Sequence, residues 1–141
     1  MHKFQFRILL RPLAALALAA APAAWAGNTF TVVANGFGAW AIDGVDNPAL
    51  TLERGQTYTF QLQNVGGIHP FNINTIDTTG SASRYNVGVS NNGATGNTAI
   101  TFVVPAAAPN TLHYNCGNHA AMNGPIAIID ADGIFADDFE L

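Results

Sequence analysis

The sequence predicts an all-β fold, a Greek-key sandwich or barrel of about seven or eight short, antiparallel strands. Apolar and polar residues alternate with a period of two in short segments, and Gly, Asn, Asp and Pro separate these segments. Tyr58, Phe60 and Leu62, set between polar residues, form the clearest alternating row. No helical period of useful length follows the first 26 residues. Many short strands with turn signals between them are typical of a sandwich or barrel.

Each expected strand has an inward row of apolar side chains that ends at a turn signal. In chain order these rows are Phe30, Val32 and Ala34; Trp40 and Ile42; Leu50 and Leu52; Tyr58, Phe60 and Leu62; His69, Phe71 and Ile73; Ile100, Phe102 and Val104; Leu112, Tyr114 and Cys116; and Ile126 and Ile128. Segment 76–96 is rich in Thr, Ser, Gly and Asn, and its pattern assigns it to no strand.

Residues 1–26 have the features of a signal peptide. Lys3, Arg7 and Arg11 make a basic start, an apolar run covers 13–21, and the A-x-A pattern at 24–26 is typical of a cleavage site. The apolar run is too short to span a bilayer, which takes about 20 residues. Since Arg7 and Arg11 are not adjacent, general secretion is expected, and the expected location is the bacterial periplasm or the medium. The domain prediction is a signal peptide over 1–26, one domain over 27–129 and an acidic tail over 130–141.

The charge of the expected mature chain is strongly negative. Only Arg54 and Arg84 remain after position 26, against nine acidic residues. This balance argues against a nucleic-acid partner, because nucleic-acid binding rests on neutralising phosphates. The tail does not fit a calcium loop: with Gly133 at the sixth position, Ile128 and Phe139 would occupy ligand positions. A flexible tail is the better interpretation.

Cys116 is the one cysteine of the sequence, although exported proteins usually carry cysteines in pairs. Such a thiol is either oxidisable, buried and inert, or bound to a metal. The run from Cys116 through His119 to Met122 places a thiolate, an imidazole and a thioether at a C-x2-H-x2-M spacing. Soft sulfur with imidazole favours copper over magnesium or calcium, and a thioether serves zinc poorly. Two His and one Cys with a weak axial Met form a blue-copper site.

The second histidine must come from elsewhere in the chain, and strand parity decides between two candidates. His69 shares the inward parity of Phe71 at the start of one strand, and Cys116 ends another. The start of one strand and the end of an antiparallel neighbour lie at the same end of a sheet. His69 is therefore predicted as the ligand, whereas His113, with Asn115, has the opposite parity and is expected to face solvent.

These features resemble the cupredoxins, with ligand-loop spacing closest to the amicyanin- and plastocyanin-like members. The resemblance covers residues 28–129 and includes the run from Asn47 to Leu52 and the His69-Pro70-Phe71 sequence. It implies equatorial copper ligands at His69, Cys116 and His119, with Met122 axial. Many cupredoxins have Asn after the first His, where it helps to tie the ligand loops. Pro70 has no N–H to donate there, so Asn115 and Asn118 are the candidate ties.

The predicted function is electron transfer by one type 1 copper ion, without enzymatic activity. Four protein ligands leave no open position for a substrate. Ala120 and Ala121 beside His119 suggest an apolar rim for docking a redox protein, and a monomer with no membrane span is expected. Two alternatives stay open: a periplasmic copper-binding or delivery protein, and a copper-free interaction module with the same fold.

Overall fold

The structure, a computed structural model, describes residues 28–131. Within this range the chain forms ten strands and no helix: β1 (Asn28–Asn35), β2 (Ala39–Ile42), β3 (Val45–Asp46), β4 (Leu50–Glu53), β5 (Thr57–Leu62), β6 (Phe71–Asn74), β7 (Val89–Ser90), β8 (Ala99–Val103), β9 (Thr111–Cys116) and β10 (Asn123–Ile129). The all-β prediction is confirmed. The expected number of strands was too low, because β3 and β7 are two-residue pairings that no alternating pattern announces.

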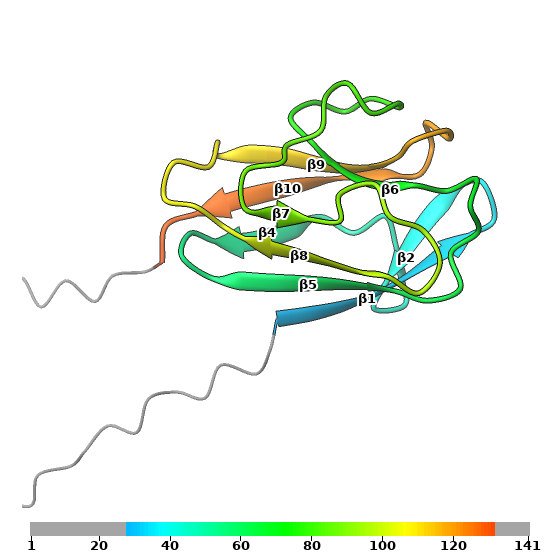
Figure 1. Cartoon of the computed structure of the whole chain (residues 1–141), viewed down its shortest axis with the longest axis horizontal. Helices are drawn as coiled ribbons and strands as arrows, with labels where there is room; N and C mark the ends of the chain where they lie inside the picture. Colours follow the sequence, from blue (N-terminus) through cyan, green and yellow to red (C-terminus); the bar gives the residue numbers. More distant parts are fainter. Residues whose placement is uncertain (1–27, 132–141) are drawn as a thin grey trace, which may run out of the picture.

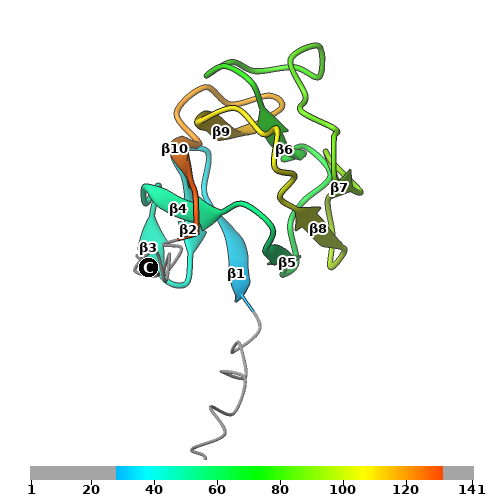
Figure 2. The same cartoon turned by 90° about the vertical axis from the view of Figure 1, so that its left-hand side faces the viewer.

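The strands form two sheets that face each other across the core (Figures 1 and 2). One sheet has six strands in the order β3-β2-β1-β5-β8-β7, and the other has four in the order β4-β10-β9-β6. The chain crosses repeatedly from one sheet to the other, for example from β3 to β4 and from β4 to β5. Strands that are consecutive in sequence are therefore often in different layers, which is the arrangement of a sandwich.

The expectation of purely antiparallel pairing was wrong at two places. β1 pairs in parallel with β5, and β10 pairs in parallel with β4. Both pairs join strands that are distant in sequence, and the crossings between layers bring each strand back in the same direction as its neighbour. Local alternation gives no information on strand direction, so only the tertiary arrangement decides it.

The core fills the space between the two sheets. The predicted inward rows supply nearly all of it, and the largest side chains that are fully buried include Trp40, Phe60, Phe71, Phe102 and Tyr114. Phe30 and Ala34 are only partly buried and pack against the edge of this core. The aromatic ring of Phe71 contacts both Trp40 and Phe60, so residues of both sheets meet at the start of β6. These contacts anchor the start of β6, the strand that follows His69, in the core.

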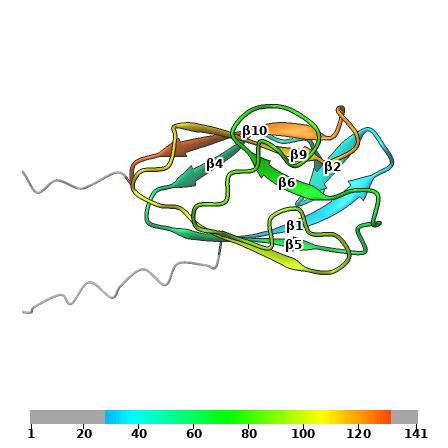
Figure 3. The ribbon, with the colours of Figure 1, turned by 45° about the horizontal axis from the view of Figure 1, so that its top comes forward.

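Residues 77–84 pass over β6 and β9 on the outer face of the four-stranded sheet, before the chain reaches β7 at the edge of the other sheet (Figure 3). Asn74 donates hydrogen bonds to the Thr78 carbonyl at 2.9 Å and to Asn115 Oδ1 at 3.1 Å, and Asn115 donates to Asp77 at 2.6 Å. Asn72, Asn74 and Asn115 are buried as a result. The expectation that Asn115 faces solvent was therefore wrong. Its parity is outward, but a loop with no pattern of its own covers that face.

The ends of the chain lie largely outside the described residues, and so do the predicted signal peptide and the tail from residue 132. β10 ends at Ile129, and Asp130 forms an ion pair with Arg54 at 3.0 Å. Among residues 28–131 no helix is long and apolar enough to cross a membrane.

Candidate metal centre

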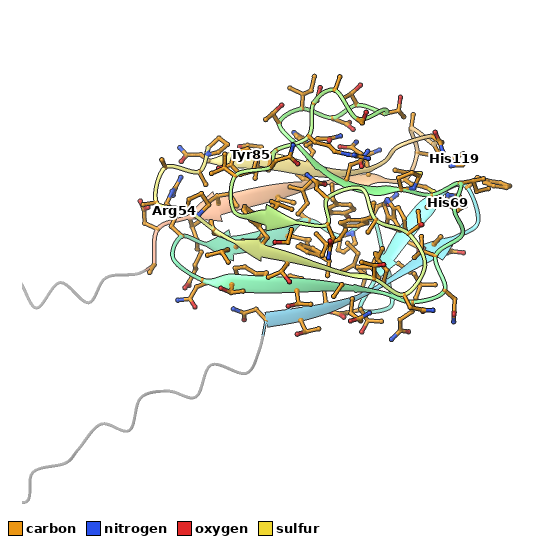
Figure 4. All side chains as sticks on the ribbon, in the orientation of Figure 1. Arg54, His69, Tyr85 and His119 are labelled. Atoms are coloured by element: carbon orange, nitrogen blue, oxygen red, sulfur yellow. The ribbon has the colours of Figure 1, made fainter. Side chains whose placement is uncertain are left out.

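Cys116 is the last residue of β9, and the antiparallel pairing of β9 with β6 places it opposite Phe71, the first residue of β6. His69 precedes β6 by two residues and therefore lies at the same end of the sheet. The ligand loop, residues 117–122, connects β9 to β10 and carries His119. The strand-parity argument for His69 is consistent with this pairing, although His69 lies just before the strand instead of within it. Figure 4 shows both histidines at this end of the molecule.

The donor atoms of Cys116, His69 and His119 converge on one point. Cys116 Sγ lies 3.7 Å from His69 Nδ1 and 3.4 Å from His119 Nδ1, and the three ligand atoms all lie within 4.8 Å of one another. A nitrogen about 2.0 Å and a sulfur about 2.3 Å from a shared metal, in a trigonal plane, lie ~3.7 Å apart. The spacing therefore fits one ion of the size of copper or zinc between the three side chains.

Burial prepares the His69 imidazole for a metal. His69 is 7% exposed, and desolvation, followed by the charge of His119, lowers its pKa below the usual value. A lower pKa favours the neutral imidazole, which is the form that binds metals. Cys116 is fully buried and has no disulfide partner. Because the site is buried and its donors are soft, it suits copper better than a hydrated hard cation.

Met122 closes the ligand loop. The Cys116 amide donates a hydrogen bond to the Met122 carbonyl at 2.8 Å, and the Met122 amide donates to the His119 carbonyl at 3.1 Å. The side chain of Met122 is fully buried in the core cluster that also contains Cys116. The loop therefore folds back so tightly that its thioether lies inside the molecule, on the same short segment as the thiol and the imidazole.

Asn118 ties the two ligand-bearing segments together. Its side-chain amide donates a hydrogen bond to the Ile68 carbonyl at 2.8 Å, and its backbone amide points at Cys116 Sγ at 3.5 Å. The Gly117 amide also donates to the Pro70 carbonyl at 2.9 Å. Of the two candidate ties, Asn118 joins the loops, whereas Asn115 bonds to segment 74–77 instead. Pro70 takes part as an acceptor, a role for which it needs no N–H.

His113 lies outside the cluster. It is half-buried on β9, where it pairs with Asn74 and Pro125 in the sheet register. Among the described residues, the group of side chains that could hold a metal contains His69, Cys116 and His119 but not His113. The choice of histidine made from strand parity agrees with this arrangement.

Two features of the site had not been predicted. The ring of Phe37, in the turn between β1 and β2, lies 5.6 Å from the ring of His69 and 5.0 Å from that of His119. Asn47 donates a hydrogen bond to the Ala121 carbonyl at 3.0 Å. The one sequence signal for Phe37 is a large apolar residue between two glycines in a turn, where a polar residue is usual. Asn47 carries no local signal for its contact.

Comparisons with known proteins point to one fold. No protein-family profile matches the sequence, and no curated protein sequence matches it. A solved structure of variant rusticyanin is 24% identical, covers 74% of this chain and 80% of its own, and superposes with a TM-score of 0.50. Rusticyanin of Thiobacillus ferrooxidans is 26% identical over 73% of this chain and 79% of its own, with a TM-score of 0.49. A Cu(I) structure of variant amicyanin is 15% identical over 72% and 83%, with a TM-score of 0.43. The first similarity establishes the fold, which is that of the cupredoxins.

Proposed function

We propose that this chain is an exported electron carrier that cycles one type 1 copper ion between Cu(II) and Cu(I). His69, Cys116, His119 and Met122 would hold this ion. The observation that carries the proposal is the convergence of one sulfur and two imidazole nitrogens at 3.4 and 3.7 Å, the spacing of donors around a shared ion. When bound, copper supplies a one-electron couple. The fold of rusticyanin, a copper protein by its description, supports the same proposal.

The residues of the site keep its geometry constant and water out. Cys116 and Met122 are fully buried and His69 nearly so, which leaves His119 as the ligand side chain that reaches the surface. Because Nδ1 of His119 faces the sulfur, its outer ring edge is turned away from the metal position. The His119 imidazole would therefore link a bound ion to the surface.

The surface around His119 is uncharged and largely apolar. Phe37 and Ile68 are large, exposed apolar residues, and Ala120 and Ala121 are exposed beside the histidine. The depression next to His69 is lined by Ala34, Gly36, Phe37, Asn64, Gly66 and Ile68, none of them charged. A small apolar rim suits brief docking, since it buries enough surface for contact but too little for a permanent complex. The partner is a redox protein that docks over His119.

Copper reconstitution tests the proposal. One equivalent of Cu(II) added to the mature protein should give one bound copper and an intense blue thiolate-to-copper charge-transfer band. Met122→Leu should keep the band and raise the reduction potential, because losing a weak axial donor disfavours Cu(II). A protein that binds no copper, or binds it without the band, would overturn the proposal and favour a copper-free interaction module. Rapid transfer of the copper to a chelating acceptor would favour delivery instead.

Export is a separate part of the proposal, and it rests on the sequence of residues 1–26. We expect the mature protein in the periplasm or the medium, as a monomer, with Gly27 at or near its N-terminus. Amino-terminal sequencing of the protein recovered from each compartment, with sedimentation of the purified protein, would check both. An uncleaved cytoplasmic protein would contradict this part and leave the copper site unaffected.

A further inference from the structure

Three aromatic rings meet at the surface of the metal centre. The ring centroids of His69 and His119 lie 4.6 Å apart, and the Phe37 ring lies 5.6 and 5.0 Å from them, tilted by 36° to each. Contacts at such distances between tilted rings are favourable beyond the area that they bury. Phe37 therefore touches both imidazoles at once, although it belongs to neither of the segments that carry them.

Burial in the core does not explain why a phenylalanine occupies position 37. It occupies the tip of the turn between Gly36 and Gly38, and its side chain is 63% exposed. Exposing an aromatic ring forgoes the free energy of burial that a core position would give. Within residues 28–131, the aromatic partners of the Phe37 ring are the two imidazoles, which belong to candidate ligands.

Asn47 links the Phe37 turn to the ligand loop. Its side-chain amide donates to the Ala121 carbonyl at 3.0 Å and, at a long 3.4 Å, to the Gly38 carbonyl, while its Oδ1 accepts from the Trp40 amide at 2.9 Å. Gly38 follows Phe37, and Ala121 lies between His119 and Met122. One side chain therefore holds the turn and the loop at a constant separation. Its backbone φ of +46° is a conformation that Asn tolerates better than most residues.

We propose that Phe37 and Asn47 are positioning residues, which hold the His119 imidazole in its metal-binding orientation before any metal is present. His69 is nearly inaccessible to solvent, and its ring also has an edge contact with Trp40 at 6.3 Å between ring centroids, so it does not depend on Phe37 alone. His119 sits on a short loop and is half-buried, so it needs a support from outside the loop. Phe37 is that support, and Asn47 keeps Phe37 in place. The inference deepens the proposed function where copper is concerned, but the positioning itself does not depend on copper.

The first experiment uses the copper-free protein. Imidazole carbon relaxation by NMR reports the mobility of each ring, with wild type, Phe37→Ala and Phe37→Leu compared. We expect Phe37→Ala to make the His119 ring markedly more mobile and to leave His69 almost unchanged, with Phe37→Leu in between. Val87→Ala is the matched control, since Val87 is an apolar residue about as exposed as Phe37, at 61%, and it lies outside the candidate ligand group and the ties between its loops. An equally ordered His119 in Phe37→Ala, or an equal loosening in Val87→Ala, would overturn the inference.

Asn47→Asp tests the link between the turn and the loop. Aspartate keeps an acceptor for the Trp40 amide and tolerates the same backbone conformation, but it has no N–H to donate to the Ala121 carbonyl. We expect the His119 ring to become more mobile in this variant as well. If Phe37→Ala loosens His119 and Asn47→Asp does not, Phe37 acts alone and the role assigned to Asn47 is wrong.

The copper-loaded protein gives a second readout. Removing groups that orient a metal ligand typically weakens binding about 10- to 100-fold. We expect Phe37→Ala to release Cu(II) to a chelator about 10-fold faster than wild type, and Val87→Ala to match wild type. Equal release rates in the two variants would contradict the inference. If neither wild type nor any variant bound copper, the proposed function would be refuted. The NMR comparison of the copper-free proteins would still decide the role of Phe37.

Discussion

At each end of the sandwich, side-chain hydrogen bonds tie neighbouring loops together, but the two ends use different residue types. At the end away from the metal centre, Arg54 donates hydrogen bonds to Asn110 Oδ1 at 2.6 Å, to the Ala108 carbonyl at 2.9 Å and to Asp130 at 3.0 Å. At the metal end, asparagine amides from Asn118 and Asn47 donate to backbone carbonyls of neighbouring loops. Figure 4 shows Arg54 and the two histidines at opposite ends of the molecule.

The use of arginine at one end and of asparagines at the other follows from the charge of these side chains. A guanidinium offers five donors and can gather several acceptors at once, so it is an efficient tie where the local charge does not matter. Beside a copper ion, a fixed positive charge would repel the metal and favour its reduced form. Neutral amides tie the loops without adding a charge. The metal end therefore uses several weak ties where the opposite end uses one strong one.

Cys116→Ser should have the largest effect on the metal end and almost none on the opposite end. The blue band belongs to the copper–sulfur bond, so its absorbance should be lost completely. A serine hydroxyl is close in size to the thiol, and we expect the free energy of unfolding of the copper-free protein to change by about 1 kcal/mol or less. Visible absorption and chemical denaturation measure the two quantities. A blue variant would show that the ligand assignment is wrong.

Arg54→Ala should show the reverse pattern. Arg54 has a side chain that is 15% exposed, and its loss leaves the carbonyl of the buried Ala108 without this donor, whereas the exposed Asn110 can bond to water. We expect the free energy of unfolding to fall by about 2–3 kcal/mol, with the blue spectrum unchanged. Arg54→Lys, which keeps the charge but has fewer donors, should lose less. A shifted copper spectrum in Arg54→Ala would mean that the two ends are coupled.

Asn118→Ala should act on the metal end alone and more mildly. It removes the hydrogen bond to the Ile68 carbonyl, which joins the two ligand segments, and a hydrogen bond of this kind contributes about 1 kcal/mol. We expect that loss of stability, a modest shift of the blue band and faster release of copper. Gln63→Ala is the control, because Gln63 is exposed and close to the same segment. If the two variants had the same stability, blue band and rate of copper release, Asn118 would have no role at the metal centre.

His113→Ala should have the smallest effect. His113 lies on β9 between the two ends and outside the candidate ligand group. We expect an unchanged blue band, unchanged copper stoichiometry and a change in stability within about 1 kcal/mol. Copper titration followed by absorption measures this. Bleaching in His113→Ala, with colour retained in His69→Ala, would reverse the choice of histidine.

Local sequence patterns predict the core and the candidate ligands, but not every buried polar residue or the direction of every strand. The inward rows and the C-x2-H-x2-M motif are local patterns, and residue type and spacing alone were enough to predict nearly all of the core and four candidate ligands. Strand parity chose His69 over His113, because alternation within a strand depends only on neighbouring residues. The same reasoning failed for Asn115, which is covered by residues 77–84, and for the two parallel strand pairs.

The sequence by itself therefore determined the β class, the candidate ligands and the chemistry that suits them, since all of these depend on residue type and short-range spacing. The tertiary structure decided how the ligands are held. Asn47 contacts Ala121 across 74 positions of the chain, and Phe37 lies over His119 from a different turn. Such contacts depend on the order of strands in the sheets, which arises from the packing of the two layers and leaves no periodic trace in the sequence.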